Sequence, residues 1–63
     1  MTEFGKTVKK RLIDIGKSQE WLIAQVRERT GLFLDNGYIY KILTGKRNAP
    51  KIVDAIKEIL GLE

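Results

Sequence analysis

The chain has 63 residues, and it contains neither cysteine nor histidine. A length of this order holds one domain with a small core and leaves no room for a substrate cavity walled on all sides. The composition excludes disulfides, Cys/His zinc sites, cysteine nucleophiles and histidine bases. With 12 basic and 8 acidic residues, the net charge is +4. We expect a single domain over residues 1–63 that uses no cofactor.

The positive charge is concentrated in residues 36–53, which contain four basic residues and no acidic residue. Such a stretch is typical of proteins that bind a polyanion, because Coulomb attraction to phosphates does not depend on base sequence. The alternative is a solvated face whose charge only keeps the protein soluble. The four basic residues are Lys41, Lys46, Arg47 and Lys51.

No segment resembles a signal peptide or a membrane span. Uninterrupted apolar runs, such as residues 32–34, are far shorter than the ~18 residues that cross a bilayer. We therefore expect a cytoplasmic protein with no membrane partner.

The first helix is predicted over residues 3–15. Thr2 is a suitable N-cap, and Gly16 fits the left-handed position that ends a helix. Gly5 is unfavourable within a helix, although its cost is smaller in the first turn. Four apolar residues spaced four, four and three apart are expected on one inward face: Phe4, Val8, Leu12 and Ile15.

The second helix is predicted to begin after Ser18, its N-cap, and to end near residue 29 or 30, before Gly31. Its inward stripe is Leu22, Ile23 and Val26, and Trp21 is expected at the edge of the core. The apolar residues 32–34 follow. They either fold down over the core or form an exposed binding patch.

The third helix is predicted over residues 36–44, with Asp35 as N-cap and Gly45 as its end. Ile39, Ile42 and Leu43 face inward at spacings of three and four residues. The opposite face carries no acidic residue. It presents Gly37, Lys41 and Thr44, flanked by Tyr38 and Tyr40.

The fourth helix is predicted over residues 50–60, because Pro50 is favoured in a first turn and Gly61 suits the end. Asn48 or Ala49 is expected at the cap. Residues 59–62 either complete the core or form a dimer contact. Together the four segments predict an all-α protein of four to five helices.

Enzyme templates do not fit this sequence. No nucleophile has a histidine or cysteine partner, and no glycine-rich phosphate loop occurs. The carboxylates that could act as acid and base are expected on helix surfaces. We therefore expect a binding protein with no small-molecule substrate.

Two segments resemble the lambda-repressor-like helix-turn-helix of phage repressors, Cro proteins and Xre-type regulators. They are SQEWL, residues 18–22, and IYKILTGKR, residues 39–47. The resemblance implies that the helix near residues 36–44 enters the major groove while the preceding helix crosses the DNA backbone. Leu22 and Ile39 are seventeen residues apart, about six more than in the compact family unit, so the turn is extended.

The resemblance also implies residue roles. Four positions match base-facing positions of the family: Asn36, Gly37, Tyr38 and Lys41. Asparagine can pair with adenine, and lysine can donate to guanine, whereas glycine only permits close approach. Six positions would contact the DNA backbone: Gln19, Tyr40, Thr44, Lys46, Arg47 and Asn48. Tyr38 and Tyr40 could instead pack their rings on the rim of the core. Lys9 and Lys10 either contact phosphate or are solvated.

These observations predict a small, sequence-specific regulator of the Cro/Xre type. It would act in the cytoplasm of a bacterial or phage-infected cell, near the nucleoid. It would repress transcription by occupying a palindromic double-stranded operator, as a homodimer. The alternative is a protein-interaction module on the same fold, such as an antitoxin, an antirepressor or an excision-associated partner. RNA binding through the same basic face is a third possibility.

Overall fold

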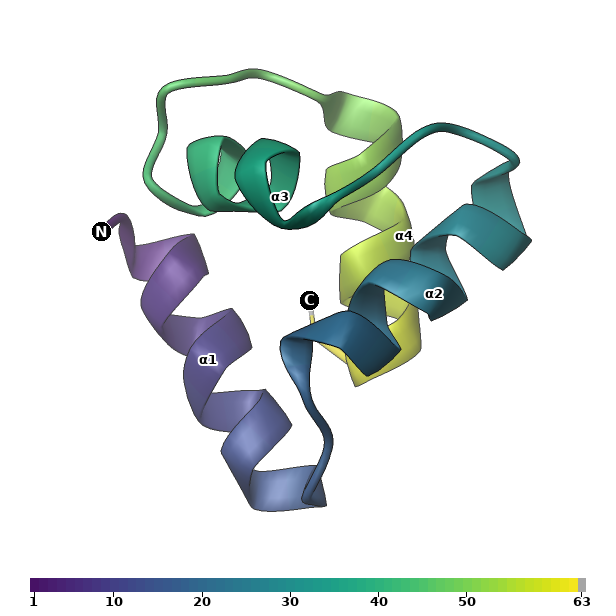
Figure 1. Ribbon diagram of the computed structural model, residues 1–63. Helices are drawn as coiled ribbons and strands as arrows, with labels where there is room; N and C mark the ends of the chain where they lie inside the picture. Colours follow the sequence, from purple (N-terminus) through teal and green to yellow (C-terminus); the bar gives the residue numbers. More distant parts are fainter. Residues whose placement is uncertain (63) are drawn as a thin grey trace.

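The computed structural model describes residues 1–62, and within them all regular structure is helical (Figure 1). The expected all-α class is therefore confirmed, at four helices for the described part of the chain. These helices are α1 (Glu3–Ile15), α2 (Gln19–Thr30), α3 (Asn36–Leu43) and α4 (Pro50–Leu60). No helix among these four is long and apolar enough to cross a membrane.

Short polar side chains begin the first three helices. Each accepts a hydrogen bond from a backbone N–H three residues later, which satisfies one of the free donors of the first turn. These N-caps are Thr2, Ser18 and Asp35, as predicted. Helix α4 begins with Pro50 after Ala49, which makes no side-chain cap. The predicted bounds of α1, α2 and α4 are confirmed.

Helix α3 ends at Leu43, one residue earlier than predicted. The Thr44 N–H still donates to the Tyr40 carbonyl, but Thr44 has left the helical conformation. Gly45 then adopts a left-handed φ of 82° and reverses the chain. Thr44 is therefore the cap of α3 and not its last turn.

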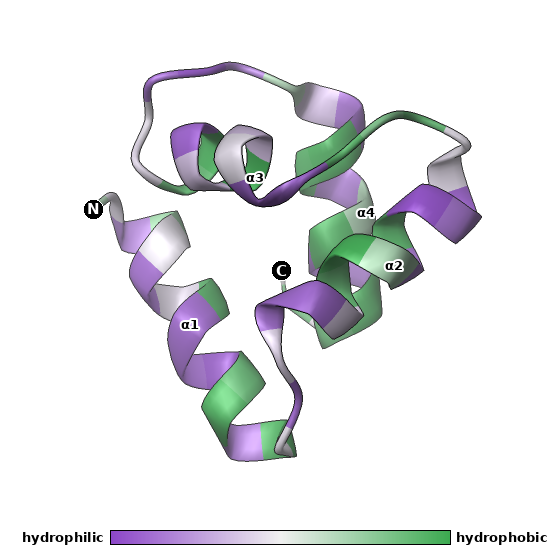
Figure 2. Ribbon diagram, in the orientation of Figure 1, coloured by the Kyte–Doolittle hydropathy of each residue, from purple (hydrophilic) through white to green (hydrophobic). Residues whose placement is uncertain are grey.

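The core lies between the four helices, and α4 packs chiefly across α2. In Figure 2 the apolar segments of α2, α3 and α4 turn toward one another. The largest fully buried side chains are Leu22, Leu34, Ile39, Leu43, Ile56, Leu60, Val8 and Val26. Every inward residue predicted for α2 and α3 is buried.

The predicted inward face of α1 is wrong at Ile15. Val8 and Leu12 are buried and Phe4 packs against the core, but Ile15 is 37% exposed. The last turn of α1 projects past the other helices, at the bottom of Figure 1, so no core remains for it to cover. Ile13 on the same turn is 79% exposed.

Residues at the C-terminal end of α4 belong to the core. Leu60 is buried, and Ile59 and Leu62 pack against the buried cluster. The Arg11 Nε–H of α1 donates to the Leu60 carbonyl at 2.9 Å. Of the two roles open to residues 59–62, these contacts favour the core role.

Gly5 holds α1 and α3 together. A Cβ at position 5 would collide with the Leu43 carbonyl oxygen at the end of α3. Beside it, the Thr2 hydroxyl donates to the same carbonyl oxygen at 2.8 Å. The helix penalty of Gly5 is thus offset by a close crossing that places α3.

Candidate nucleic-acid interface

Helices α2 and α3 are consecutive and are joined by residues 31–35, which run from the upper right of Figure 1 down to the start of α3. Their first residues meet, because Gln19 Nε2 donates to Asn36 Oδ1 at 3.2 Å. The structure shows which elements separate Leu22 from Ile39. They are the rest of the 12-residue α2 and the loop of residues 31–35.

A polar chain continues from Gln19 to α1. Lys9 Nζ donates to Gln19 Oε1 at 2.8 Å, so the Gln19 amide joins all three helices at one surface. Both hydrogen bonds are exposed. Of the α1 lysines noted in the sequence, Lys9 is the one that reaches the start of α2.

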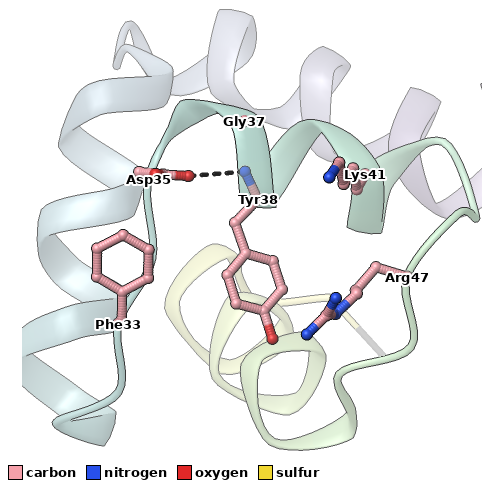
Figure 3. Close-up of a pocket in the computed structure, with 6 residues that line it drawn as sticks. All are labelled: Phe33, Asp35, Gly37, Tyr38, Lys41 and Arg47. Atoms are coloured by element: carbon pink, nitrogen blue, oxygen red, sulfur yellow. Dashed lines mark hydrogen bonds between the residues drawn. The ribbon is translucent and has the colours of Figure 1, made fainter.

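Three of the four predicted base-facing residues line one open hollow on the outer side of α3 (Figure 3). These are Gly37, Tyr38 and Lys41, and Arg47 from the following loop joins them. The hollow has a volume of about 440 Å³. The fourth base-facing residue, Asn36, lies in the first turn of α3 and is exposed.

The two tyrosines of α3 have different surroundings. Tyr38 is half-buried against the core, and the Arg47 guanidinium lies 5.2 Å from its ring centre. This cation–π contact holds Arg47 beside α3. Tyr40 is 54% exposed. Packing on the core rim therefore describes Tyr38 and not Tyr40.

The loop after α3 folds back on the end of that helix. The backbone N–H groups of Lys46 and Arg47 both donate to the Lys41 carbonyl, at 2.8 and 3.2 Å. Their side chains, and that of Asn48, are exposed. The Thr44 hydroxyl instead donates to the Tyr40 carbonyl at 2.8 Å, which turns this side chain toward its own helix.

The positive charge at this surface is not neutralised by neighbouring carboxylates. The ion pairs among residues 1–62 are Glu3–Lys6 and Arg29–Glu58, and neither includes a basic residue of α3 or of the loop after it. The acidic residue on the hollow is Asp35, whose Oδ1 accepts the Tyr38 N–H at 2.8 Å as the α3 cap. Cations thus dominate the α3 end and the loop.

The apolar residues 32–34 differ in burial. Leu34 is fully buried, whereas Leu32 and Phe33 are 40% and 64% exposed. Phe33 lines the same hollow as Gly37 and Lys41. Sequence reasoning did not assign Phe33 to the site, although the unusual apolar tripeptide in a loop was a signal.

Comparison of the chain with protein-family models, with curated proteins and with solved structures gives no match. The lambda-repressor-like resemblance of residues 18–22 and 39–47 therefore stays a prediction.

Proposed function

We propose that this protein binds double-stranded DNA in a sequence-specific manner, as a small regulator with a lambda-repressor-like helix-turn-helix. Helix α3 would lie in the major groove and α2 would cross the DNA backbone. The observation that carries the proposal is the exposed, acid-poor surface of α3 and its following loop, where Lys41, Lys46 and Arg47 have no carboxylate partner among residues 1–62.

The first turn of α3 is suited to base readout. Asn36 Oδ1 accepts from Gln19 but has a second lone pair, and its NH₂ group remains a donor. Asn36 can therefore pair with adenine without releasing Gln19. Lys41 can donate to the guanine O6 and N7 atoms. Gly37 has no side chain, so the helix can approach the base edges closely.

The remaining residues would position the protein on phosphates. Lys46, Arg47 and Asn48 extend from a loop that backbone hydrogen bonds hold against α3. Gln19 lies at the N-terminus of α2, where free N–H groups also favour an anion. Tyr40 is exposed beside them. Thr44 is the weakest member of this set, because its hydroxyl proton is already donated to Tyr40.

The proposed mechanism is steric. Two chains bound to a palindromic operator would place two α3 helices about one helical turn apart on one DNA face. Occupation of that site would block the polymerase or alter its recruitment. The proposal includes no catalytic step and no small-molecule ligand.

A second candidate function, a protein-interaction module, is favoured by an apolar groove beside the same helix. This groove of about 370 Å³ runs between the residue 31–35 loop and the start of α4. Its lining is Leu32, Tyr38, Ala49, Pro50, Lys51 and Ile52. A partner protein that inserts an apolar side chain would fit there.

A salt titration of duplex binding tests the DNA proposal. The logarithm of the binding constant should fall steeply and linearly with the logarithm of salt concentration. Lys46→Ala should reduce that slope by about one unit, since one phosphate contact is lost. Arg29→Ala is the matched control. It removes the same charge from the α2–α4 side, where Arg29 pairs with Glu58, and should leave the slope unchanged.

Selection from random duplexes tests specificity. The native protein should enrich one shared motif, and Lys41→Ala should relax the preference at one base position. Absence of duplex binding at low salt would overturn the proposal. Binding without a shared motif would overturn the specific regulator and leave a non-specific DNA-binding protein.

A further inference from the structure

Phe33 is an exposed aromatic residue that its neighbours hold in place. The next residue, Leu34, is fully buried and anchors the loop in the core. On one side, the Leu32 N–H donates to Thr30 Oγ1 at 3.1 Å. On the other, Asp35 caps α3 through the Tyr38 N–H. A loop fixed on both sides presents the Phe33 ring at low entropic cost to any partner.

The Phe33 ring opens onto the hollow beside α3. Figure 3 shows the rings of Phe33 and Tyr38 on the same side of the helix, with Lys41 and Arg47 further along. Gly37 leaves the surface of the hollow open, because a Cβ at this position would have the Asp35 carboxylate, at 3.7 Å, as its one neighbour within 4 Å. The hollow therefore has the Phe33 ring and the Asp35 carboxylate at one end and the cationic Arg47 side chain at the other.

The Asp35 carboxylate restricts which chemical groups of DNA can lie at the Phe33 end of the hollow. Its negative charge lies on the hollow and would repel a phosphate group. A neutral base edge carries no such penalty. In the major groove, the apolar group that the four standard bases present is the C5-methyl of thymine.

From these contacts, and resting on the proposed DNA binding, we infer that Phe33 is a specificity-determining residue that packs against a thymine methyl group. The contact buries part of the exposed ring and part of the methyl group from water. It comes from the extended turn and not from α3, so it adds a base position beyond those that Asn36 and Lys41 read.

The test replaces single thymines of the selected operator by deoxyuridine, which removes only the methyl group. We expect one thymine in each half-site at which the native protein loses about fourfold in affinity, the amount for one buried methyl-sized group. Phe33→Ala should bind the thymine and deoxyuridine duplexes equally at that position. Phe33→Leu should retain part of the difference.

Ile13→Ala is the control. Ile13 is a comparably exposed apolar residue at the far end of α1, and its removal should leave the fourfold difference intact. Thermal melting of Phe33→Ala should match the native protein, because the ring is 64% exposed. This second measurement separates loss of the contact from loss of folding.

Three results would overturn the inference while DNA binding stands. They are a selected site without thymine, deoxyuridine effects that are equal in the native protein and Phe33→Ala, and no deoxyuridine effect in either. A Phe33 ring that docks a protein instead would give the last of these. If the native protein binds no duplex at low salt, the proposed function itself fails, and the inference falls with it.

Discussion

The two connections that flank α3 are built in different ways. Residues 31–35, before the helix, are apolar in the middle, and the burial of Leu34 fixes them to the core. Residues 44–49, after the helix, are polar and basic. They are held by backbone hydrogen bonds from Lys46 and Arg47 to the Lys41 carbonyl. In Figure 2 the first connection is largely green and the second largely purple.

This difference indicates how a small domain can equip one helix with two kinds of surface. A side chain buried at one position of a loop leaves its neighbour exposed in a defined place, as with Leu34 and Phe33. A loop anchored through its backbone leaves its side chains free to carry charge, as with Lys46. Exposed apolar side chains and exposed charged side chains can then be varied separately on the two sides of α3.

Among the variants that test this comparison, Leu34→Ala should have the largest effect on stability. Removing a fully buried leucine should lower the free energy of unfolding by about 3 kcal/mol. That is a large share for a domain of this size, whose total stability is on the order of 5 kcal/mol. Urea unfolding measures the loss. A loss below about 1 kcal/mol would contradict the anchoring role of Leu34.

The two connections can also be compared through a glycine near the start of each one. Gly31 and Gly45 both have left-handed φ values, 69° and 82°, so each alanine substitution should cost about 1 kcal/mol in backbone strain. At Gly31 the new Cβ meets open space, whereas at Gly45 it comes within 3.0 Å of the Thr2 methyl group. Gly45→Ala should therefore lower the melting temperature more than Gly31→Ala. Equal shifts would show that the Thr2 methyl yields freely.

The smallest expected effect is at the cap of α3. Asp35→Ala removes the acceptor of the Tyr38 N–H and should destabilise the protein by about 1 kcal/mol. Asp35→Asn keeps an acceptor oxygen and should remain near native stability, as measured in the same denaturant titration. If the asparagine variant were as unstable as the alanine variant, charge and not capping would explain the loss.

Except for the end of α3, the helix boundaries were predictable because local chemistry sets them. Thr2, Ser18 and Asp35 act as caps within their own segments, and the glycines after α1, α2 and α4 end those helices. The exposure of Ile15 was not predictable. Helical spacing specifies which face a residue lies on, but it does not specify where along the helix the core ends.

The arrangement of the candidate site residues was predictable where it depends on one helix and not where it depends on contacts across helices. Gly37, Tyr38 and Lys41 share a face by helical geometry, and the structure brings them to one hollow. The hydrogen bond from Gln19 to Asn36 spans seventeen residues, and Arg47 reaches Tyr38 across the end of a helix. Such pairings need the tertiary structure, which composition and spacing do not contain.

The Thr2 hydroxyl links local unfolding of α1 to local unfolding of α3. It accepts the Gly5 N–H, which starts α1, and donates to the Leu43 carbonyl, which ends α3. Fraying of the first turn of α1 therefore also releases the end of α3, although 41 residues separate them. In amide hydrogen exchange these two helix ends should lose protection together, as one cooperative unit. The orientation of α3 then depends on the second residue of the chain.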